Sequence, residues 1–197
     1  FMNKTAVLKM MTDARDMRSK QPEFENLVLN RRVEMNSPFV SRALWKENGG
    51  DVVDDFDGCD VFAGLDLSET ADLTALVMTA RVDDAWHVKP IFWLPEAGLR
   101  EKSVKDRVPY YDWHKAKFLD TTPGHSIQYE FVAQRLFDLH RQHPFRKIAF
   151  DRWNMKHLRP WLIRAGMSES LIDDRFVEFG QGYQSMTPAL RTLESLL

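Results

Sequence analysis

Two aspartates that each end an apolar run are the residues of this sequence whose type and placement most favour chemistry. Asp66 follows Gly64-Leu65, and Asp151 follows Ile148-Ala149-Phe150. An ionised carboxylate at the end of a buried strand is costly unless a partner compensates its charge, and a divalent cation with oxygen ligands is such a partner. Each aspartate alone also fits ordinary structure, Asp66 as a turn residue and Asp151 as the N-cap of a helix.

The two aspartates together favour a shared site. In an open α/β sheet, ligands bind beyond the strand ends near a crossover, so strand-end carboxylates on neighbouring strands point at one place. Such a pair either binds metal or shares a proton, because two like charges repel. Three polar residues follow Asp66 in the turn to the next strand, where we expect them to bond the backbone or to hold waters of a metal shell; they are Ser68, Thr70 and Asp72.

The segments that must position Asp66 have the pattern of consecutive strands. Three apolar runs predict strands at Val61–Leu67, Leu73–Val82 and Trp86–Leu94. Asp83-Asp84, between the last two runs, predicts a tight hairpin turn.

The segments around Asp151 predict alternating helices and strands. The expected elements are a helix over 129–142, a strand over 147–150, a helix over 154–164, a strand over 176–179 and a helix that opens at Thr187-Pro188. Residues 96–126 are expected to be irregular, with one helical turn near 110–117. Three strands in a meander followed by this alternation predict an α/β sheet of mixed strand direction.

The N-terminal part of the chain has a different character. Apolar residues at helical spacing predict a helix over 4–19, and Ser37-Pro38 predicts the start of a second helix. Residues 51–58 are acidic and end in glycine, which is typical of a linker. We therefore expect a helical lead-in over 1–57 and a folded α/β domain over 58–197.

Composition limits the class of protein. The 197 residues carry a formal net charge of −2 and 44% hydrophobic residues, which fits one globular core and argues mildly against a stand-alone, high-affinity DNA binder. No apolar run is long enough to cross a bilayer, and the single cysteine, Cys59, fits a reducing compartment. His140 and His143 have no partners arranged around them in the sequence, so we expect a solvated helix end there.

The chain resembles the C-terminal nuclease domain of the large terminase subunit of tailed phages over nearly its whole length. Two blocks carry most of the resemblance: Gly64 to Ser68 with Thr70, Asp72 and Thr74, and Ile148 to Asp151 with Trp153-Asn154. Supporting matches are Leu29-Asn30 and Trp45 before these blocks, and Gln181-Gly182 with Ser185 and Pro188 after them.

The resemblance implies a ribonuclease-H-like fold, a mixed β-sheet flanked by helices, with an acidic site for two divalent cations, Mg²⁺ or Mn²⁺. It also implies endonucleolytic cleavage of double-stranded DNA when genome packaging starts and ends. By position, Asp66 matches the family's first-strand acid and Asp151 its second acid. Asp72 matches an acidic position just after the first strand, so it is a further candidate metal ligand. The implied partners are double-stranded DNA, the terminase ATPase domain, the portal and the small terminase subunit, in the host cytoplasm and without a membrane.

Two features of the family have no match in these residues. No G-x-x-x-x-G-K-[ST] phosphate loop occurs, so the ATPase domain is expected elsewhere in the natural chain. The family's third acid lies on a late C-terminal element, and no residue up to Leu197 matches it. We therefore expect the nuclease domain to be incomplete at its C-terminus.

The expected mechanism is two-metal phosphodiester hydrolysis, in which one ion activates a water and the other stabilises the leaving 3′ oxygen. Asp66 is expected to bridge both ions and Asp151 to bind one. Arg152 and Lys156 are expected to contact DNA phosphates. Two other interpretations stay open: a phosphotransferase or ATPase of the actin and sugar-kinase superfamily, and a non-catalytic module that docks DNA or the portal.

Overall fold

The computed structural model divides the chain into two compact units, one formed by Phe1–Gly50 with Glu194–Leu197 and the other by Asp51–Leu193. The residues that the structure describes are 3–16, 24–25, 27–29, 40–50, 53, 55–68 and 72–197. The division falls after Gly50, whereas the sequence pattern placed a boundary after Asp57. Each unit is described by itself.

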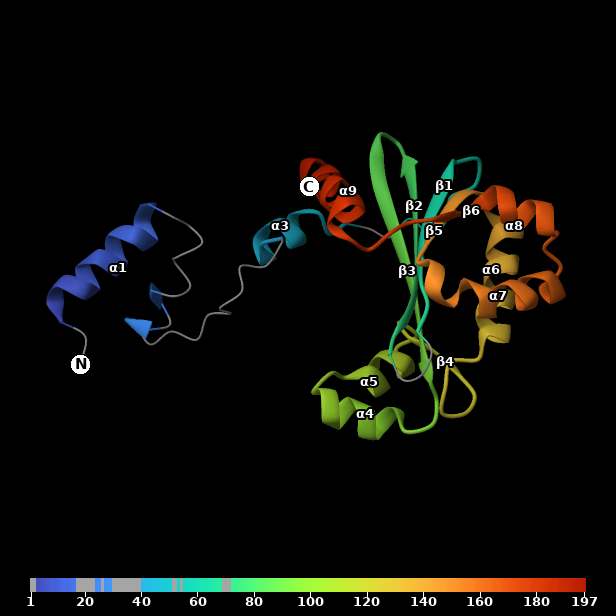
Figure 1. Cartoon of the computed structure of the whole chain (residues 1–197), viewed down its shortest axis with the longest axis horizontal. Coiled ribbons are helices and arrows are strands. Elements are labelled where there is room, and N and C mark those ends of the chain that lie inside the picture. The colour runs from blue at the N-terminus through green and yellow to red at the C-terminus, as the bar shows by residue number, and fades with distance from the viewer. Residues whose placement is uncertain are drawn as a thin grey trace. The chain divides into compact units, whose positions relative to one another are not determined.

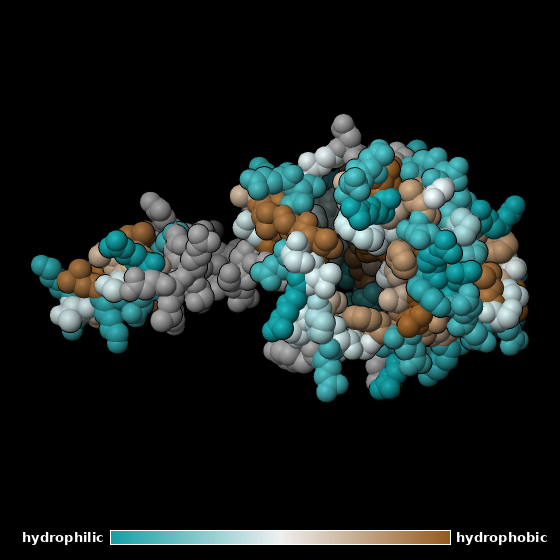
Figure 2. All heavy atoms as spheres, turned by 90° about the horizontal axis from the view of Figure 1, so that it is seen from above, coloured by the Kyte–Doolittle hydropathy of each residue, from teal (hydrophilic) through white to brown (hydrophobic). Residues whose placement is uncertain are grey.

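The smaller unit begins with α1, which spans Lys4–Asp16. This helix lies within the predicted helix over 4–19, and the last three residues of that prediction are outside the described residues. Leu8 and Met11 are exposed on α1, and hydrophobic side chains are visible as brown atoms on this part of the surface, at the left of Figure 2. The amphipathic face of α1 is therefore only partly covered within its own unit.

The second described helix of the smaller unit, α3, spans Arg42–Glu47 and begins later than the sequence predicted. The hydroxyl of Ser41 caps α3 by accepting a hydrogen bond from the N–H of Leu44 at 3.1 Å. The predicted start at Ser37-Pro38 lies outside the described residues. Val40 and Ser41 are described and are not helical, so α3 does not extend back to that position.

The larger unit is built around a six-stranded sheet with the strand order β4-β3-β2-β1-β5-β6 (Figure 1). Its strands are β1 (Val61–Asp66), β2 (Thr74–Val82), β3 (Ala85–Pro95), β4 (Asp120–Thr122), β5 (Phe145–Phe150) and β6 (Phe176–Glu178). β1, β2 and β3 form an antiparallel meander. β5 and β6 run parallel to β1, and β4 runs parallel to β3. The predicted mixed sheet is confirmed.

The tight turn predicted between β2 and β3 is also confirmed. Asp83 and Asp84 both have positive φ, 47° and 66°. Two positive φ values are the mark of a type I′ turn, whose twist matches that of the flanking strands. The turn sets the register of the hairpin, in which Val82 pairs with Ala85.

Helices cover one face of the sheet (Figure 1). They are α6 (Tyr129–Gln142), α7 (Arg152–Ala165) and α8 (Glu169–Arg175). Side chains of β1 alternate between buried and exposed, because successive residues of a strand point to opposite faces. The buried side chains join those of α6 and α7 in one core, whose members include Val61, Leu65, Met78, Leu136, Ile148, Leu158 and Leu162. This core fixes β1 and β5 relative to each other.

The sequence patterns miss three elements of the larger unit: α4 (Leu99–Asp106), β4 and α8. α4 begins after Gly98, which has φ 78° and offers no side-chain cap, so the usual start signal is absent from the sequence. α8 does have such a signal, because the hydroxyl of Ser168 accepts from the N–H of Leu171 at 3.2 Å. The helical turn expected near 110–117 is α5 (Tyr110–Lys115).

The last helix, α9, spans Tyr183–Leu196 and begins before the predicted start at Thr187-Pro188. A hydrogen bond of 2.9 Å from the N–H of Met186 to the carbonyl of Gly182 closes its first turn. Pro188 therefore lies inside the helix, where it removes one backbone hydrogen bond without ending the helix. Neither α9 nor any other helix that the structure describes is long and apolar enough to cross a membrane.

The expectation of a solvated pair of histidines at the end of α6 is wrong. His143 is buried beside Phe56, with 6.0 Å between the ring centroids. His140 is half-buried, and its Nδ1 accepts a hydrogen bond from the N–H of Phe145 at 3.1 Å. Both rings belong to the packing around the end of α6 and the start of β5.

His140 makes the stability of the fold depend on pH. Burial, and then the positive charge of Arg175, hold the pKa of His140 below its ordinary value of 6.5. Below pH 6.5, His140 therefore binds a proton in the unfolded chain more readily than in the folded chain. The folded state has its full stability above pH 6.5 and loses part of it as the pH falls through the lowered pKa of His140. We expect the melting temperature to drop as the pH falls from above 6.5 toward the lowered pKa of His140, and to drop less in His140→Asn, whose amide keeps an acceptor that does not titrate. If the melting temperature of His140→Asn fell with pH as steeply as that of the unmodified chain, His140 would not have this role.

Candidate active site

The two aspartates predicted from the sequence lie at the ends of neighbouring parallel strands. In the register of β1 with β5, Leu65 is opposite Phe150. Asp66 and Asp151 are the next residues along the chain, so they stand side by side at the same end of the sheet. We call these two residues the acidic pair. The structure brings them together, and their catalytic role stays a prediction.

The two carboxylates of the acidic pair differ in exposure. Asp66 is the last residue of β1, is exposed, and is opposite Ala75 of β2. Leu65 before it is buried in the core, so the alternation of the strand directs the Asp66 side chain to the other face of the sheet. Asp151 is half-buried and lies directly before α7. A ligand in solvent can therefore reach Asp66 at this sheet end.

Three side-chain hydrogen bonds hold the backbone that follows Asp66. The amide of Asn154 on α7 donates to the carbonyl of Leu67 at 2.7 Å. The hydroxyl of Tyr129 on α6 donates to the carbonyl of Ser68 at 2.8 Å. The N–H of Ser68 donates to the hydroxyl of Thr74 on β2 at 3.0 Å. We call these three bonds the Leu67–Ser68 clamp.

The Leu67–Ser68 clamp connects the two segments that carry the acidic pair. Asn154 is three residues after Asp151, and its partner Leu67 is one residue after Asp66. One hydrogen bond therefore ties the first turn of α7 to the end of β1. Sequence reasoning missed this role because Asn154 and Leu67 are 87 positions apart, and no local pattern indicates which distant carbonyl an asparagine bonds.

The polar residues of the turn between β1 and β2 have different surroundings. The hydroxyl of Ser68 is buried, and no residue that the structure describes gives it a hydrogen-bond partner. Thr70 lies outside the described residues. Asp72 is exposed, and its charge contributes to the raised pKa of Lys102 on α4, after the larger effect of the hydrogen bond between Lys102 and Asp106. Asp72 is thus within electrostatic range of α4.

The two residues predicted to contact phosphates lie at the start of α7. Arg152 is its first residue and Lys156 is four positions further, so both side chains share one face of the helix. Both residues are exposed. A helix N-terminus also presents backbone N–H groups and a partial positive charge, which favour an anion. The start of α7 is therefore suited to bind a phosphate next to the acidic pair.

The acidic pair offers two protein carboxylates to a metal. Among the residues that the structure describes, no group of three or more histidine, cysteine, aspartate or glutamate side chains gathers into a metal site. Two carboxylates suit Mg²⁺, which keeps several waters and is commonly held by one or two carboxylates together with substrate phosphates. The buried hydroxyl of Ser68 fits the same arrangement, because a water of the metal shell is a suitable partner for it.

The chain is similar in sequence and in structure to phage terminases. The family model described as "Terminase large subunit, endonuclease domain" matches residues 3–197. The chain is 39% identical over 198 aligned residues to the large terminase subunit of Enterobacteria phage HK97, with 100% of this chain and 38% of that protein covered. The crystal structure of the HK97 bacteriophage large terminase matches with a TM-score of 0.72 at 38% identity, over 100% of this chain and 40% of that chain. The chain thus spans about two-fifths of the length of these relatives, and the likeness confirms the predicted ribonuclease-H-like fold.

Proposed function

Because the chain belongs to the family of terminase large-subunit endonuclease domains, we propose that it hydrolyses phosphodiester bonds of double-stranded DNA during the packaging of a phage genome. The observation that carries this proposal is the acidic pair. The parallel pairing of β1 with β5 places Asp66 beside Asp151 at one end of the sheet, and adjacent carboxylates at an accessible sheet end suit metal-assisted hydrolysis of a phosphate ester.

Two divalent cations, Mg²⁺ or Mn²⁺, are the cofactors that suit this site. Asp66 and Asp151 would hold them through carboxylate oxygens, and the hydroxyl of Ser68 would bond a water of their shell. When bound, the cations supply an activated water and neutralise charge at the leaving oxygen. Asp72, near α4, would contribute its negative charge to the electrostatic field around the site. It would not join Asp66 and Asp151 as a third metal ligand.

Other residues of the chain position the acids and the substrate. The Leu67–Ser68 clamp keeps the end of β1 in one conformation. Arg152 and Lys156 bind phosphates without reading bases, because phosphate contacts carry no sequence information. The partners in this proposal are double-stranded DNA, the ATPase domain in the same natural chain, the portal and the small terminase subunit, in the host cytoplasm.

A thermal-shift experiment combined with plasmid cleavage tests this proposal. We expect Mn²⁺ to raise the melting temperature, because a ligand that binds only the folded state stabilises it. ATP added to Mg²⁺ should add nothing to the shift that Mg²⁺ gives alone, and plasmid DNA should be cut with Mn²⁺ and left intact with a chelator. A shift that requires ATP would favour the phosphotransferase instead. No shift and no cleavage would favour the docking module.

A further inference from the structure

We propose that the helical hairpin formed by α4 and α5, residues 98–118, binds the phosphate backbone of the DNA duplex on the side of the acidic pair away from α7. We call this segment the basic hairpin. The proposal rests on the proposed function for the identity of the polymer, and it adds a surface that neither the acidic pair nor α7 provides. The charge, backbone, ring contacts and position of the basic hairpin carry the argument.

The basic hairpin is positive although the whole chain is not. Residues 98–118 contain six lysines and arginines against three acidic residues, whereas the whole chain has a formal net charge of −2. One of the three acids, Asp106, is bound by Lys102 at 2.8 Å. Within the basic hairpin, all of which the structure describes, five cations have no carboxylate ion-pair partner: Arg100, Lys105, Arg107, Lys115 and Lys117. A phosphate backbone is the polyanion that such a set of exposed cations complements.

The backbone of the basic hairpin places two of these cations in a conformation that glycine would adopt more easily. Arg107 ends α4 with φ 56°, and Lys117 follows α5 with φ 62°. Left-handed backbone of this kind is strained for residues with a Cβ. The helix dipole stabilises a cation near a helix C-terminus, but a cation one residue earlier would receive the same stabilisation without backbone strain. Glycine would therefore suit both positions, and these two cationic side chains can be removed without straining the backbone.

Ring contacts give the basic hairpin a cationic face. The guanidinium of Arg100 lies 4.1 Å from the ring centroid of Tyr111 and donates a hydrogen bond to its hydroxyl. The ammonium of Lys115 lies 4.8 Å from the same centroid. These cations lower the pKa of Tyr111, first through the hydrogen bond from Arg100. The contacts hold two positive groups at one place, which reduces the entropy that binding a phosphate costs.

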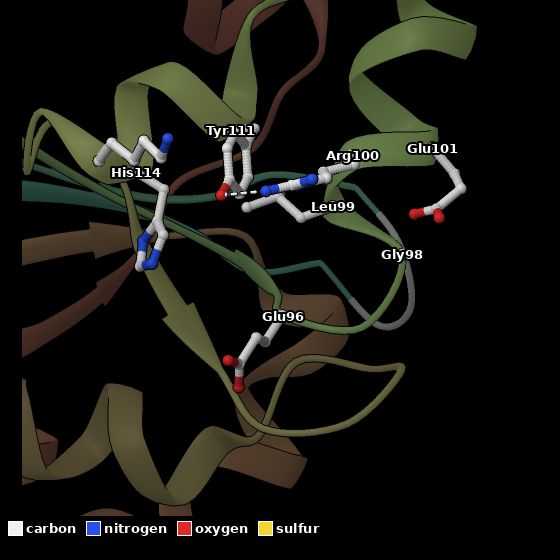
Figure 3. Close-up of a pocket in the computed structure, with 8 residues that line it drawn as sticks. Glu96, Gly98, Leu99, Arg100, Glu101, Tyr111 and His114 are labelled. Carbon is white, nitrogen blue, oxygen red and sulfur yellow. Dashed lines mark hydrogen bonds between the residues drawn. The ribbon is translucent and has the colours of Figure 1, made fainter.

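A pocket of about 480 Å³ opens at this face, between the end of β3 and the two helices. Figure 3 shows the Arg100 guanidinium and the Tyr111 hydroxyl meeting in it, while the carboxylates of Glu96 and Glu101 stand apart from that pair. Two large aromatic side chains nearby in the hairpin are exposed, Trp113 at 42% and Phe118 at 72%.

The basic hairpin lies at the same end of the sheet as the acidic pair. Asp66 is opposite Ala75, and Ala75 is opposite Phe92 on β3, so the end of β3 is two strands away, roughly 10 Å. α4 follows that end of β3 directly, and Lys102 on α4 is within electrostatic range of Asp72. One turn of a duplex is about 34 Å long, so DNA with a phosphate at Asp66 reaches the hairpin on one side and the start of α7 on the other.

The test removes charge from the basic hairpin without harming the fold. In the variant Arg107→Gly with Lys117→Gly, glycine suits both φ values, so we expect the melting temperature to stay equal or to rise. Fluorescence anisotropy with a short DNA duplex, without divalent metal so that nothing is cut, should show an affinity about 3- to 10-fold weaker. The slope of log affinity against log salt should fall by about 2, because two phosphate contacts are lost.

The matched control removes the same charge from the opposite end of the sheet. Arg81→Gln with Arg146→Gln breaks two exposed ion pairs, to Asp84 and Asp60, and should bind DNA with the affinity and salt slope of the unmodified chain. Equal DNA affinity and slope for the glycine variant and this control would overturn the proposal. So would a glycine variant that loses affinity only for polyglutamate, which would identify an acidic protein partner. The glycine variant could lose DNA affinity while the unmodified chain shows no metal-dependent cleavage. That result would support DNA binding by the basic hairpin and would contradict the proposed nuclease function.

Discussion

Asp66→Asn is expected to lower the rate of Mn²⁺-dependent DNA cleavage by about 100-fold or more, because residues that merely orient a metal ligand already contribute about 10- to 100-fold. Asparagine keeps the shape of the side chain but removes the negative charge with which Asp66 would hold the cations. Asp66 is exposed, so the fold does not depend on its carboxylate and the melting temperature should stay unchanged. Plasmid nicking and thermal unfolding, measured on the same preparation, check both expectations.

Asp60→Asn is the matched control for Asp66→Asn. Asp60 precedes β1 and pairs with Arg146 at 2.6 Å, so it is an exposed aspartate at the opposite end of the same pair of strands. Its variant should cleave within about twofold of the unmodified rate, because exposed ion pairs contribute little. Asp151→Asn should match Asp66→Asn, and the double variant should be no slower than either single one, because groups that act as a unit are not additive. Full-rate cleavage by Asp66→Asn would remove the acidic pair from the mechanism.

Asn154→Ala is expected to slow cleavage by between about 10- and 100-fold although it alters neither acid, because displacing a reacting group by about 1 Å is enough for such a loss. The substitution deletes the donor that lies 2.7 Å from the carbonyl of Leu67 and releases the backbone just after Asp66. The free energy of unfolding should fall by about 1–3 kcal/mol, since a partly buried acceptor is left unsatisfied. Cleavage rates over a range of Mn²⁺ concentrations, with urea denaturation, measure the two effects separately.

Ser168→Ala distinguishes positioning from general destabilisation. It removes the N-cap of α8, whose hydroxyl accepts from the N–H of Leu171, and should cost about 1 kcal/mol. Since α8 takes no part in the Leu67–Ser68 clamp, cleavage should be unaffected. Tyr129→Phe removes a different hydrogen bond of the clamp, the one to the carbonyl of Ser68. Like Asn154→Ala, it should slow cleavage. If Ser168→Ala slowed cleavage as much as Asn154→Ala, the clamp would have only a structural role.

The elements that the sequence predicted well are those whose signals are local. The β2–β3 hairpin follows from period-two apolar patterns and an Asp-Asp turn, both visible within a short window. The helix over Tyr129–Gln142 agrees with its prediction at both ends, because an apolar face at helical spacing is continuous there. The acidic pair was predictable for the same reason, since each aspartate directly follows a buried run.

The features that the sequence did not predict depend on distant partners or on unusual backbone. The Leu67–Ser68 clamp joins residues that are 61 and 87 positions apart. α4 starts at a left-handed glycine without a cap, and β4 has only three residues whose pairing with β3 defines them. The burial of His143 beside Phe56 likewise depends on a tertiary contact. None of these leaves a periodic pattern, so tertiary structure alone determines them.

The parallel pairing of β1 with β5 also governs when the acidic pair exists during synthesis of the chain. The meander of β1, β2 and β3 can form once Pro95 has left the ribosome, because its pairings are local. Asp66 gains its neighbour Asp151 only after β5 and the first turn of α7 have emerged and a loop of some eighty residues has closed, which carries an entropic cost that grows with loop length. A nascent chain therefore carries a folded hairpin long before Asp66 and Asp151 become neighbours, and a translation product that stops short of Asp151 lacks the acidic pair.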